Sequence, residues 1–148
     1  MTGSGYSVWS MSGESAPPIT LARTRLLAVD DEPQVARFVA QAAEALGCAA
    51  ESTSTAEGFR TTYKRLLPDV VVLDLNLCGA DGIELIRFLA QEESSALVLV
   101  LSGFDTRVVE AAVRLGLALG LNMGEPLAKP ILVDDLAAAI RNGGTAIH

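Results

Sequence analysis

Apolar residues along this chain alternate between short continuous runs and longer stretches with helical spacing. The continuous runs cover residues 26–29, 70–73 and 97–101. Runs of this kind are typical of parallel strands that are buried on both faces. Weaker runs over 48–53 and 124–128 predict two more strands. The pattern therefore predicts five strands, each separated from the next by a stretch that suits a helix.

Helical spacing is clearest after the first strand. Pro33 suits a first helical position, and Gly47 suits the end of a helix. Between them, apolar residues recur three and four positions apart at Val35, Phe38, Val39, Ala42 and Leu46. Further helices are predicted over 55–66, 83–91, 105–118 and 132–141. Five strands alternating with five helices predict an α/β protein with helices on both faces of a parallel sheet.

The two ends of the chain lack this pattern. Residues 1–22 are rich in Ser, Gly, Thr and Pro, which predicts a flexible N-terminal tail. The domain is expected over 23–143, followed by a short C-terminal tail over 144–148. Tyr6 and Trp9, together with Met11, add apolar character to the first tail. A docking role for these side chains stays open beside the simpler interpretation of a disordered tail.

Composition narrows the class of protein. The chain has 148 residues, of which 50% are hydrophobic, enough for one domain with a core. Its net charge of −7 argues against nucleic-acid and anionic-membrane partners. No apolar run approaches the roughly 20 residues that span a bilayer, and the start does not resemble a secretory signal. Cys48 and Cys78 lack CxxC spacing, which indicates two reduced thiols. These features predict a cytoplasmic protein.

Charged and polar residues stand where four of the predicted strands end: Asp30 and Asp31, Asp74, Ser102 and Lys129. A charge at the end of a buried strand is costly unless it meets a metal, a partner or a substrate. Parallel strands end at the same edge of a sheet, where ligands bind. The pattern therefore predicts a Mg²⁺-assisted phosphoryl site at that edge.

Each side chain has a role in this hypothesis. Asp30, Asp31 and Asp74 offer the oxygen ligands that Mg²⁺ prefers. The second oxygen of Asp74 is free to attack phosphorus and form an acyl phosphate. Lys129 and Ser102 are expected to contact phosphoryl oxygens. The alternative is that the acids before Pro33 merely cap a helix, worth about 1 kcal/mol; it leaves Asp74 unexplained.

The same residues carry a family resemblance. The motifs are Val29-Asp30-Asp31-Glu32-Pro33, Asp74 with Gly79-Ala80-Asp81-Gly82, Ser102-Gly103 and Lys129-Pro130. Over residues 25–141 this order resembles the receiver domain of two-component response regulators. The resemblance implies a flavodoxin-like, doubly wound, five-stranded parallel sheet with strand order 2-1-3-4-5. It implies a cis Lys129–Pro130 peptide, and phosphoryl transfer to Asp74 from a sensor histidine kinase or phosphotransfer protein. Mg²⁺ would be held by Asp30, Asp31, Asp74 and the carbonyl of Asn76.

The chain departs from that family pattern in three places. Cys78 replaces a usual proline, and Pro126 stands where most receivers have a Tyr or Phe switch residue. The interval from Ser102 to Lys129 is longer than usual. Residues 115–124 are similar to receivers attached to cyclic-di-GMP phosphodiesterases. This part is expected to form the signalling face of helix 4, strand 5 and helix 5, where exposed leucines would give a partner or homodimer surface.

Two positions are expected to set the lifetime of the phosphoryl group. Asn76 and Phe104 lie where the family tunes dephosphorylation, and the bulk of Phe104 predicts a long-lived phosphoryl state. Two rival functions remain. An aspartyl-phosphate phosphatase would usually carry an acid where this chain has Asn76. A receiver-shaped binding module that is never phosphorylated would not need the full set of acids. The sequence does not identify the downstream target.

Overall fold

The computed structural model describes residues 21, 23–77, 81–103 and 105–146. Strands and helices alternate along them, as the sequence predicts. The strands are β1 (Arg25–Val29), β2 (Ala49–Thr53), β3 (Val70–Asp74), β4 (Leu97–Ser102), β5 (Asn122–Met123) and β6 (Leu127–Ala128). The helices are α1 (Pro33–Ala45), α2 (Ala56–Leu66), α3 (Asp81–Gln91), α4 (Thr106–Ala118) and α5 (Val133–Ala146).

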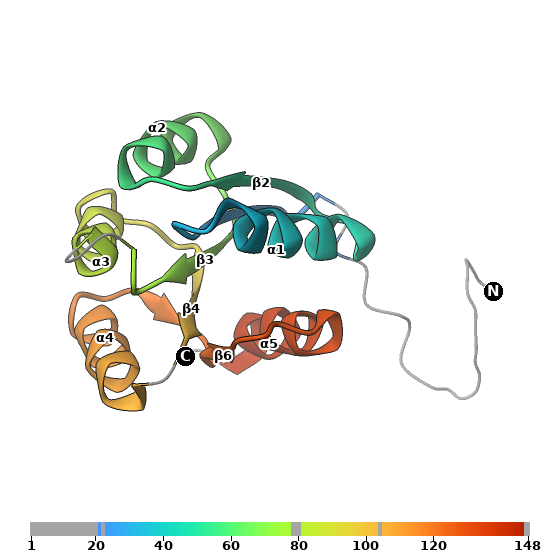
Figure 1. Cartoon of the computed structure of the whole chain (residues 1–148). Helices are drawn as coiled ribbons and strands as arrows, with labels where there is room; N and C mark the ends of the chain where they lie inside the picture. The colour runs from blue at the N-terminus through green and yellow to red at the C-terminus, as the bar shows by residue number, and fades with distance from the viewer. Residues whose placement is uncertain (1–20, 22, 78–80, 104, 147–148) are drawn as a thin grey trace.

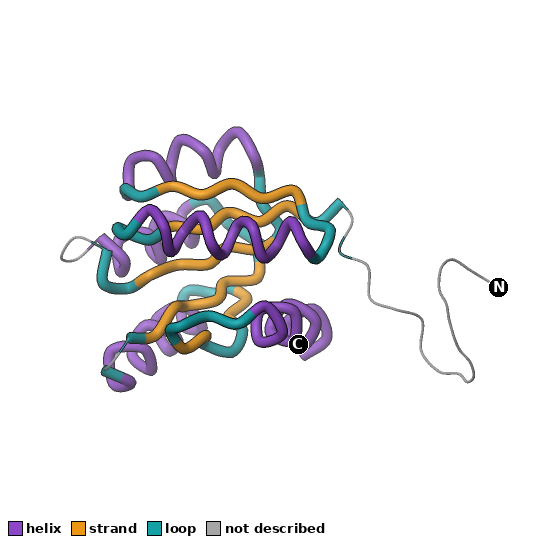
Figure 2. The backbone as a smooth tube through the Cα atoms, turned by 45° about the vertical axis from the view of Figure 1, so that its right-hand side comes forward, coloured by secondary structure: helices purple, strands orange, loops and turns teal. Residues whose placement is uncertain are grey.

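The strands form one parallel sheet in the order β2-β1-β3-β4-β5, and β6 also pairs with β4 (Figure 2). This confirms the predicted flavodoxin-like order 2-1-3-4-5. Since all pairs are parallel, the carboxyl ends of the strands lie at one edge of the sheet. Register then sets what meets there: Val29 pairs with Leu73, and Asp74 pairs with Leu101. Asp30 follows Val29 directly, so Asp30 and Asp74 end neighbouring strands.

Two hydrophobic clusters hold the helices against the sheet. Successive side chains of a strand point to opposite faces, so Leu27 and Val29 join one cluster while Leu26 and Ala28 join the other. The first cluster packs under α2, α3 and α4, and the second under α1 and α5 (Figure 1). The strand residues in both clusters are fully buried. This agrees with the prediction that the central strands are covered on both faces.

The fifth strand differs from the prediction of a single run over 124–128. It is split into β5 and β6, which pair with the two ends of β4. Between these pairings the fifth strand holds one residue more than β4 does, so Gly124, Glu125 and Pro126 form a bulge. Pro126 has no N–H to give to a ladder, which explains the break. A Cβ on Gly124 would lie 2.7 Å from a methyl carbon of Leu99, so the strand approaches β4 closely there.

Two helices are longer than predicted. α3 begins at Asp81 rather than Ile83, and α5 continues to Ala146 rather than ending near Arg141. Gly82 at the start of α3 presses on the chain after β3: an added Cβ would lie 2.8 Å from the Cα and the carbonyl oxygen of Leu75. This contact fixes the beginning of α3 against the residue that follows Asp74.

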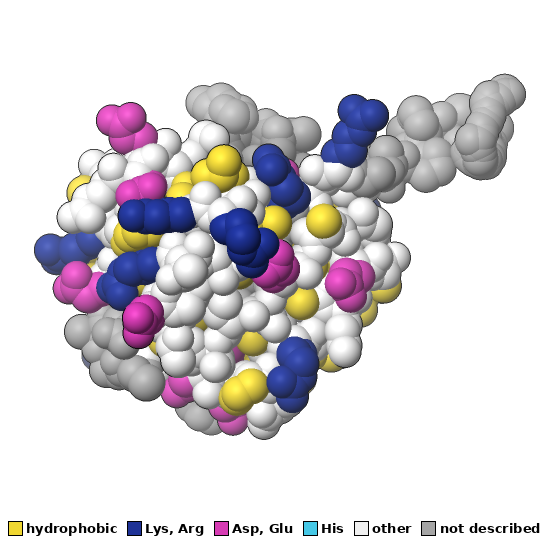
Figure 3. Space-filling view, turned by 90° about the horizontal axis from the view of Figure 1, so that it is seen from above, with side chains coloured by type: hydrophobic (Ala, Val, Ile, Leu, Met, Phe, Trp, Pro, Cys, Tyr) yellow, Lys and Arg dark blue, Asp and Glu magenta, His cyan; other side chains and the backbone are white. Residues whose placement is uncertain are grey.

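β2 forms one edge of the sheet, and this side of the molecule carries charges of both signs. Arg65 of α2 reaches across to Glu51 of β2 with two hydrogen bonds of 2.6 and 3.1 Å. Figure 3 looks onto this side, where acidic and basic side chains are interspersed. Charged side chains on an edge strand discourage pairing with another chain. None of the described helices is both long and apolar enough to cross a membrane.

Candidate functional site

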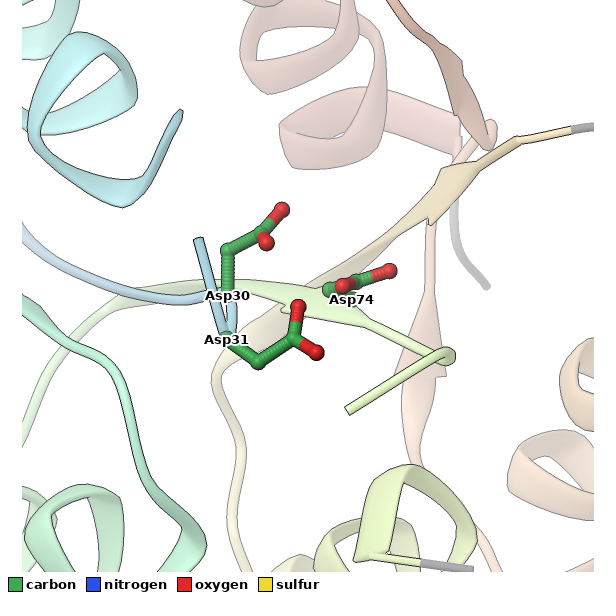
Figure 4. A group of neighbouring side chains, drawn as sticks. All are labelled: Asp30, Asp31 and Asp74. Atoms are coloured by element: carbon green, nitrogen blue, oxygen red, sulfur yellow. The ribbon is translucent and has the colours of Figure 1, made fainter. Parts of the chain in front are cut away.

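Three carboxylates gather at the carboxyl edge of the sheet. Asp30 and Asp31 follow β1, and Asp74 ends β3; one oxygen from each lies within 4.8 Å of the others (Figure 4). Asp30 and Asp74 are buried, with 0% and 1% of their surface exposed, whereas Asp31 is exposed to solvent. The arrangement is an acidic pocket with two carboxylates at its floor and one at its rim.

Lys129 brings the opposite charge into this pocket. It follows β6, and its Nζ lies 2.9 Å from Oδ2 of Asp30 and 3.6 Å from Oδ1 of Asp74. The next peptide, Lys129–Pro130, is cis, as the family resemblance implied. The ammonium therefore bridges two acids from different strands, with Asp30 as the nearer partner.

Main-chain N–H groups hold the two buried carboxylates in place. Oδ1 of Asp30 accepts a hydrogen bond of 2.9 Å from the N–H of Glu32, and Oδ1 of Asp74 accepts one of 3.1 Å from the N–H of Asn76. Each bond spans two residues, the pattern of an Asx turn. Both carboxylates are thus oriented by the loop that follows their own strand.

The charges in the pocket affect one another. Burial raises the pKa of Asp74 above its ordinary value, and the neighbouring Asp30 adds to the rise, although the N–H of Asn76 and the ammonium of Lys129 oppose it. Burial lowers the pKa of Lys129, but the contact with Asp30 and the charges of Asp74 and Glu32 outweigh this, so its pKa is raised overall. The three acids of the pocket favour a bound cation. The ammonium of Lys129 is a cation that the chain itself places there.

The helix-capping alternative fails for these acids. The residue before α1 is Glu32, and its side chain makes no capping hydrogen bond. Asp30 instead turns its carboxylate toward Lys129 and into the pocket. Sequence reasoning placed Glu32 in the motif around Asp30 and among the possible caps, but it missed that the N–H of Glu32 positions Asp30. Pro33 follows Glu32 directly, which is the sequence signal that a tight turn leads into α1 without a side-chain cap.

The residues present suit a divalent cation. Oδ2 of Asp30 is buried, and the ammonium of Lys129 lies 2.9 Å from it. Carboxylate oxygens from three residues lie close enough to share one ion. Hard oxygen donors of this kind are the ligands that Mg²⁺ prefers. The acidic triad therefore fits the predicted metal.

The other predicted residues are placed in part. Asn76 lies in the turn after β3, and a Cβ on Gly103 would come 3.4 Å from its Nδ2, so the loops after β3 and β4 are neighbours. Ser102 ends β4, where its main chain pairs with Ala128. Phe104 and Cys78 lie outside the described residues. Pro126 is exposed in the bulge between β5 and β6.

The leucine-rich segment divides as predicted into core and surface. Leu121 and Met123 are buried, and Leu115 packs against the same cluster. Leu117 and Leu119, at the end of α4, are exposed by 58% and 42%, and Val108 at its start is exposed too. α4 therefore presents separate apolar side chains to solvent near both of its ends.

Comparison with known proteins gives a consistent result. The model of the response regulator receiver domain family matches residues 26–141. The DNA-binding response regulator MtrA of Mycolicibacterium smegmatis is 30% identical over 80% of this chain and 50% of its own length. The acid tolerance regulatory protein ActR of Rhizobium meliloti is 34% identical over 78% of this chain and 57% of its own length. The chain thus spans about half the length of these curated relatives.

A solved structure agrees over nearly its whole length. A response regulator from Colwellia psychrerythraea is similar with a TM-score of 0.70 and 29% identity, covering 83% of this chain and 98% of that one. The match with the family model spans the sheet, the acidic pocket and the lysine after β6. The chain belongs to the family of response regulator receiver domains, which are signalling phosphoacceptor modules.

Proposed function

We propose that this receiver accepts one phosphoryl group on Asp74, from a sensor histidine kinase or a phosphotransfer protein, with Mg²⁺ as cofactor. The observation that carries the proposal is the position of Asp74: a buried carboxylate with Lys129 Nζ 3.6 Å away and two further acids beside it. A nucleophile in such a pocket is shielded from water, and cations can offset the charge of an incoming phosphoryl group.

The transfer step uses the side chains described above. One carboxylate oxygen of Asp74 attacks phosphorus. The bond from phosphorus to the donor's imidazole nitrogen breaks, and its electron pair returns to the ring, leaving an acyl phosphate on Asp74. Lys129 would follow the new phosphoryl oxygens, exchanging part of its contact with Asp30 for them. Ser102, at the end of β4, is proposed to meet another of these oxygens.

The metal is assigned to Asp30, Asp31, Asp74 and the main-chain carbonyl of Asn76. When bound, Mg²⁺ would offset the repulsion between the carboxylates and the anionic phosphoryl group. The support for this set is the cluster of three acidic side chains, each with an oxygen within 4.8 Å of the others. The carbonyl of Asn76 comes from the family resemblance.

Incubation with acetyl phosphate and Mg²⁺, followed by intact mass measurement, tests the proposal. We expect a gain of one phosphoryl group that disappears with EDTA and in Asp74→Asn. Glu44→Gln, an exposed acid on α1, is the matched control and should be modified like the parent. No gain, or a gain that survives Asp74→Asn, would overturn the assignment.

We propose that the lifetime of the phosphoryl group is set by Asn76 and Phe104. The proximity of the loops after β3 and β4, through Asn76 and Gly103, supports a shared role at the mouth of the site. Phe104→Ser should shorten the lifetime several-fold by admitting water. An unchanged decay of the phosphorylated mass would contradict this role.

We propose that the phosphorylated chain signals through a partner that binds the face formed by α4, β5 and α5. The exposed Leu117 and Leu119 at the end of α4, and the exposed Val108 at its start, support a protein surface there, either for a target or for a second copy. Pro126 in place of an aromatic residue argues for a readout other than a rotating ring. The resemblance of residues 115–124 to receivers attached to cyclic-di-GMP phosphodiesterases stays a prediction. Light scattering of the phosphorylated and unphosphorylated chain, with Leu117→Glu as control, tests the homodimer.

A further inference from the structure

An apolar pocket lies beside the phosphoryl site, between the first turns of α1 and the loop after β6. Its volume is about 260 Å³, room for one aromatic side chain. It is lined by Gln34, Val35, Phe38, Lys129, Pro130 and Ile131. Phe38 is 43% exposed, although it sits on the helix face next to the pocket. A large exposed aromatic side chain at the mouth of an apolar pocket marks a surface that gains from being covered.

The N-terminal segment leaves the folded domain on the same face. Leu21 packs against the cluster formed by α1, α5 and one side of the sheet. α1 and α5 lie side by side on that face (Figure 1). Leu21, the first residue that the structure describes, therefore lies on the side of the sheet where the pocket opens.

The length of the segment matches the distance. The N–H of Ala49 donates to the carbonyl of Thr24, which places the exit near the C-terminal end of α1. The pocket lies at the opposite end of this 13-residue helix, roughly 20 Å away at 1.5 Å per residue. A flexible chain of the length between Trp9 and Leu21 has a root-mean-square span of roughly 20 Å. Trp9 can thus reach the pocket without stretching the linker.

The chemistry of the segment suits the pocket as well. Between two Gly- and Ser-rich stretches stand four apolar side chains within six residues, namely Tyr6, Val8, Trp9 and Met11. Trp9 is the only tryptophan in the chain. An indole offers a large apolar area at a low cost in conformational entropy, and a lysine stem is a suitable neighbour for its face.

We propose that residues 6–11 dock in cis on this pocket, with the indole of Trp9 against Phe38 and the stem of Lys129. Docking of this segment does not depend on the proposed function.

Fluorescence of the full chain tests docking without any phosphorylation step. Since Trp9 is the only tryptophan, its emission reports one site. We expect emission that is blue-shifted, and less quenched by iodide, than that of the same chain unfolded in guanidinium. Phe38→Ala should shift the emission most of the way to the unfolded position. Leu117→Ala, an exposed apolar residue on the opposite face of the sheet, is the control and should leave it unchanged.

A second measurement keeps the test independent of damage to α1. In amide NMR spectra, Trp9→Ala should move the signals of Gln34, Phe38 and Ile131 and leave those of Leu117 and Leu119 in place. Emission equal to that of the unfolded chain would overturn the proposal. So would a blue shift that survives Phe38→Ala, which places Trp9 elsewhere. A blue shift that is lost on dilution would also overturn it, because the segment would then dock on a second copy.

Discussion

At the scale of single residues, the pocket is built so that one ammonium serves two buried acids. Lys129 Nζ is 2.9 Å from Asp30 and 3.6 Å from Asp74, while each carboxylate also accepts a main-chain N–H. Asp74 nevertheless keeps a raised pKa, because burial and the charge of Asp30 outweigh these partners. The fold therefore disfavours the charged form of the Asp74 carboxyl group.

That cost predicts how stability depends on pH. A carboxyl group whose folded pKa is raised lowers stability as pH rises from its ordinary value, near 3.8, through the folded pKa. In EDTA, Asp74→Asn should therefore match the parent at low pH and be more stable than the parent at neutral pH. Urea unfolding at several pH values measures the difference. Glu44→Gln is the control, and a neutral-pH loss of stability in Asp74→Asn would contradict the account.

Removing the ammonium group of Lys129 should lower the stability of the folded chain, whereas Asp74→Asn should raise it. Lys129→Met leaves Asp30 buried beside Asp74 without its ion-pair partner, which should cost about 2 kcal/mol, less than for a fully buried pair because Lys129 is partly exposed. Saturating Mg²⁺ should recover much of the loss by replacing the cation. Thermal unfolding with and without Mg²⁺ measures both. An equal loss in the two conditions would mean that the metal does not bind near Asp30.

At the scale of elements, regular patterns were predicted well and close approaches were not. The runs around Val71 and Leu99 and the helical spacing after Pro33 indicate strands and helices directly, because burial sets their period. The break at Gly124–Pro126 was missed, since a bulge depends on the register against β4. The early start of α3 depends on the contact of Gly82 with Leu75, which no local pattern shows. The site acids were predictable because each follows its own strand.

The end of α2 offers a test of these backbone arguments. Leu67 ends α2 with φ 51°, in the left-handed region, and its side chain is 58% exposed. Leu67→Gly should stabilise the protein by roughly 0.5–1 kcal/mol, because a Cβ is unfavourable there. Leu117 is equally exposed but lies within α4, where Leu117→Gly should cost about 1 kcal/mol. Denaturant unfolding of both variants decides; shifts of the same sign would contradict the helix-end argument.

At the scale of the whole molecule, the sheet brings distant residues of the chain to one edge. Asp30, Asp74 and Lys129 lie at the carboxyl ends of β1, β3 and β6. α1 and α5 cover the face of the sheet beside them. α4, with its exposed apolar side chains, lies with the other layer of helices. The acidic pocket lies at the ends of β1 and β3, whereas the proposed output face lies at the β5 end of the sheet.

The metal assignment predicts a global effect. A ligand that binds only the folded chain adds stability of about 2.7 kcal/mol at one hundred times its dissociation constant. Mg²⁺ should therefore raise the melting temperature of the parent. Asp30→Asn should lose most of this rise, while Glu44→Gln keeps it. Sodium salts at the same ionic strength serve as control, and an equal rise with them would argue against a specific site.

The central claim is that Asp74 becomes an acyl phosphate, and reductive trapping tests it most directly. Borohydride converts an aspartyl phosphate to homoserine, which peptide mass spectrometry locates in the sequence. After treatment with a phosphohistidine donor and Mg²⁺, we predict homoserine at position 74 alone, and none when EDTA replaces Mg²⁺. Homoserine at Asp30, Asp31 or Asp81 instead, or no trapped residue from a chain that has gained a phosphoryl group, would contradict the account.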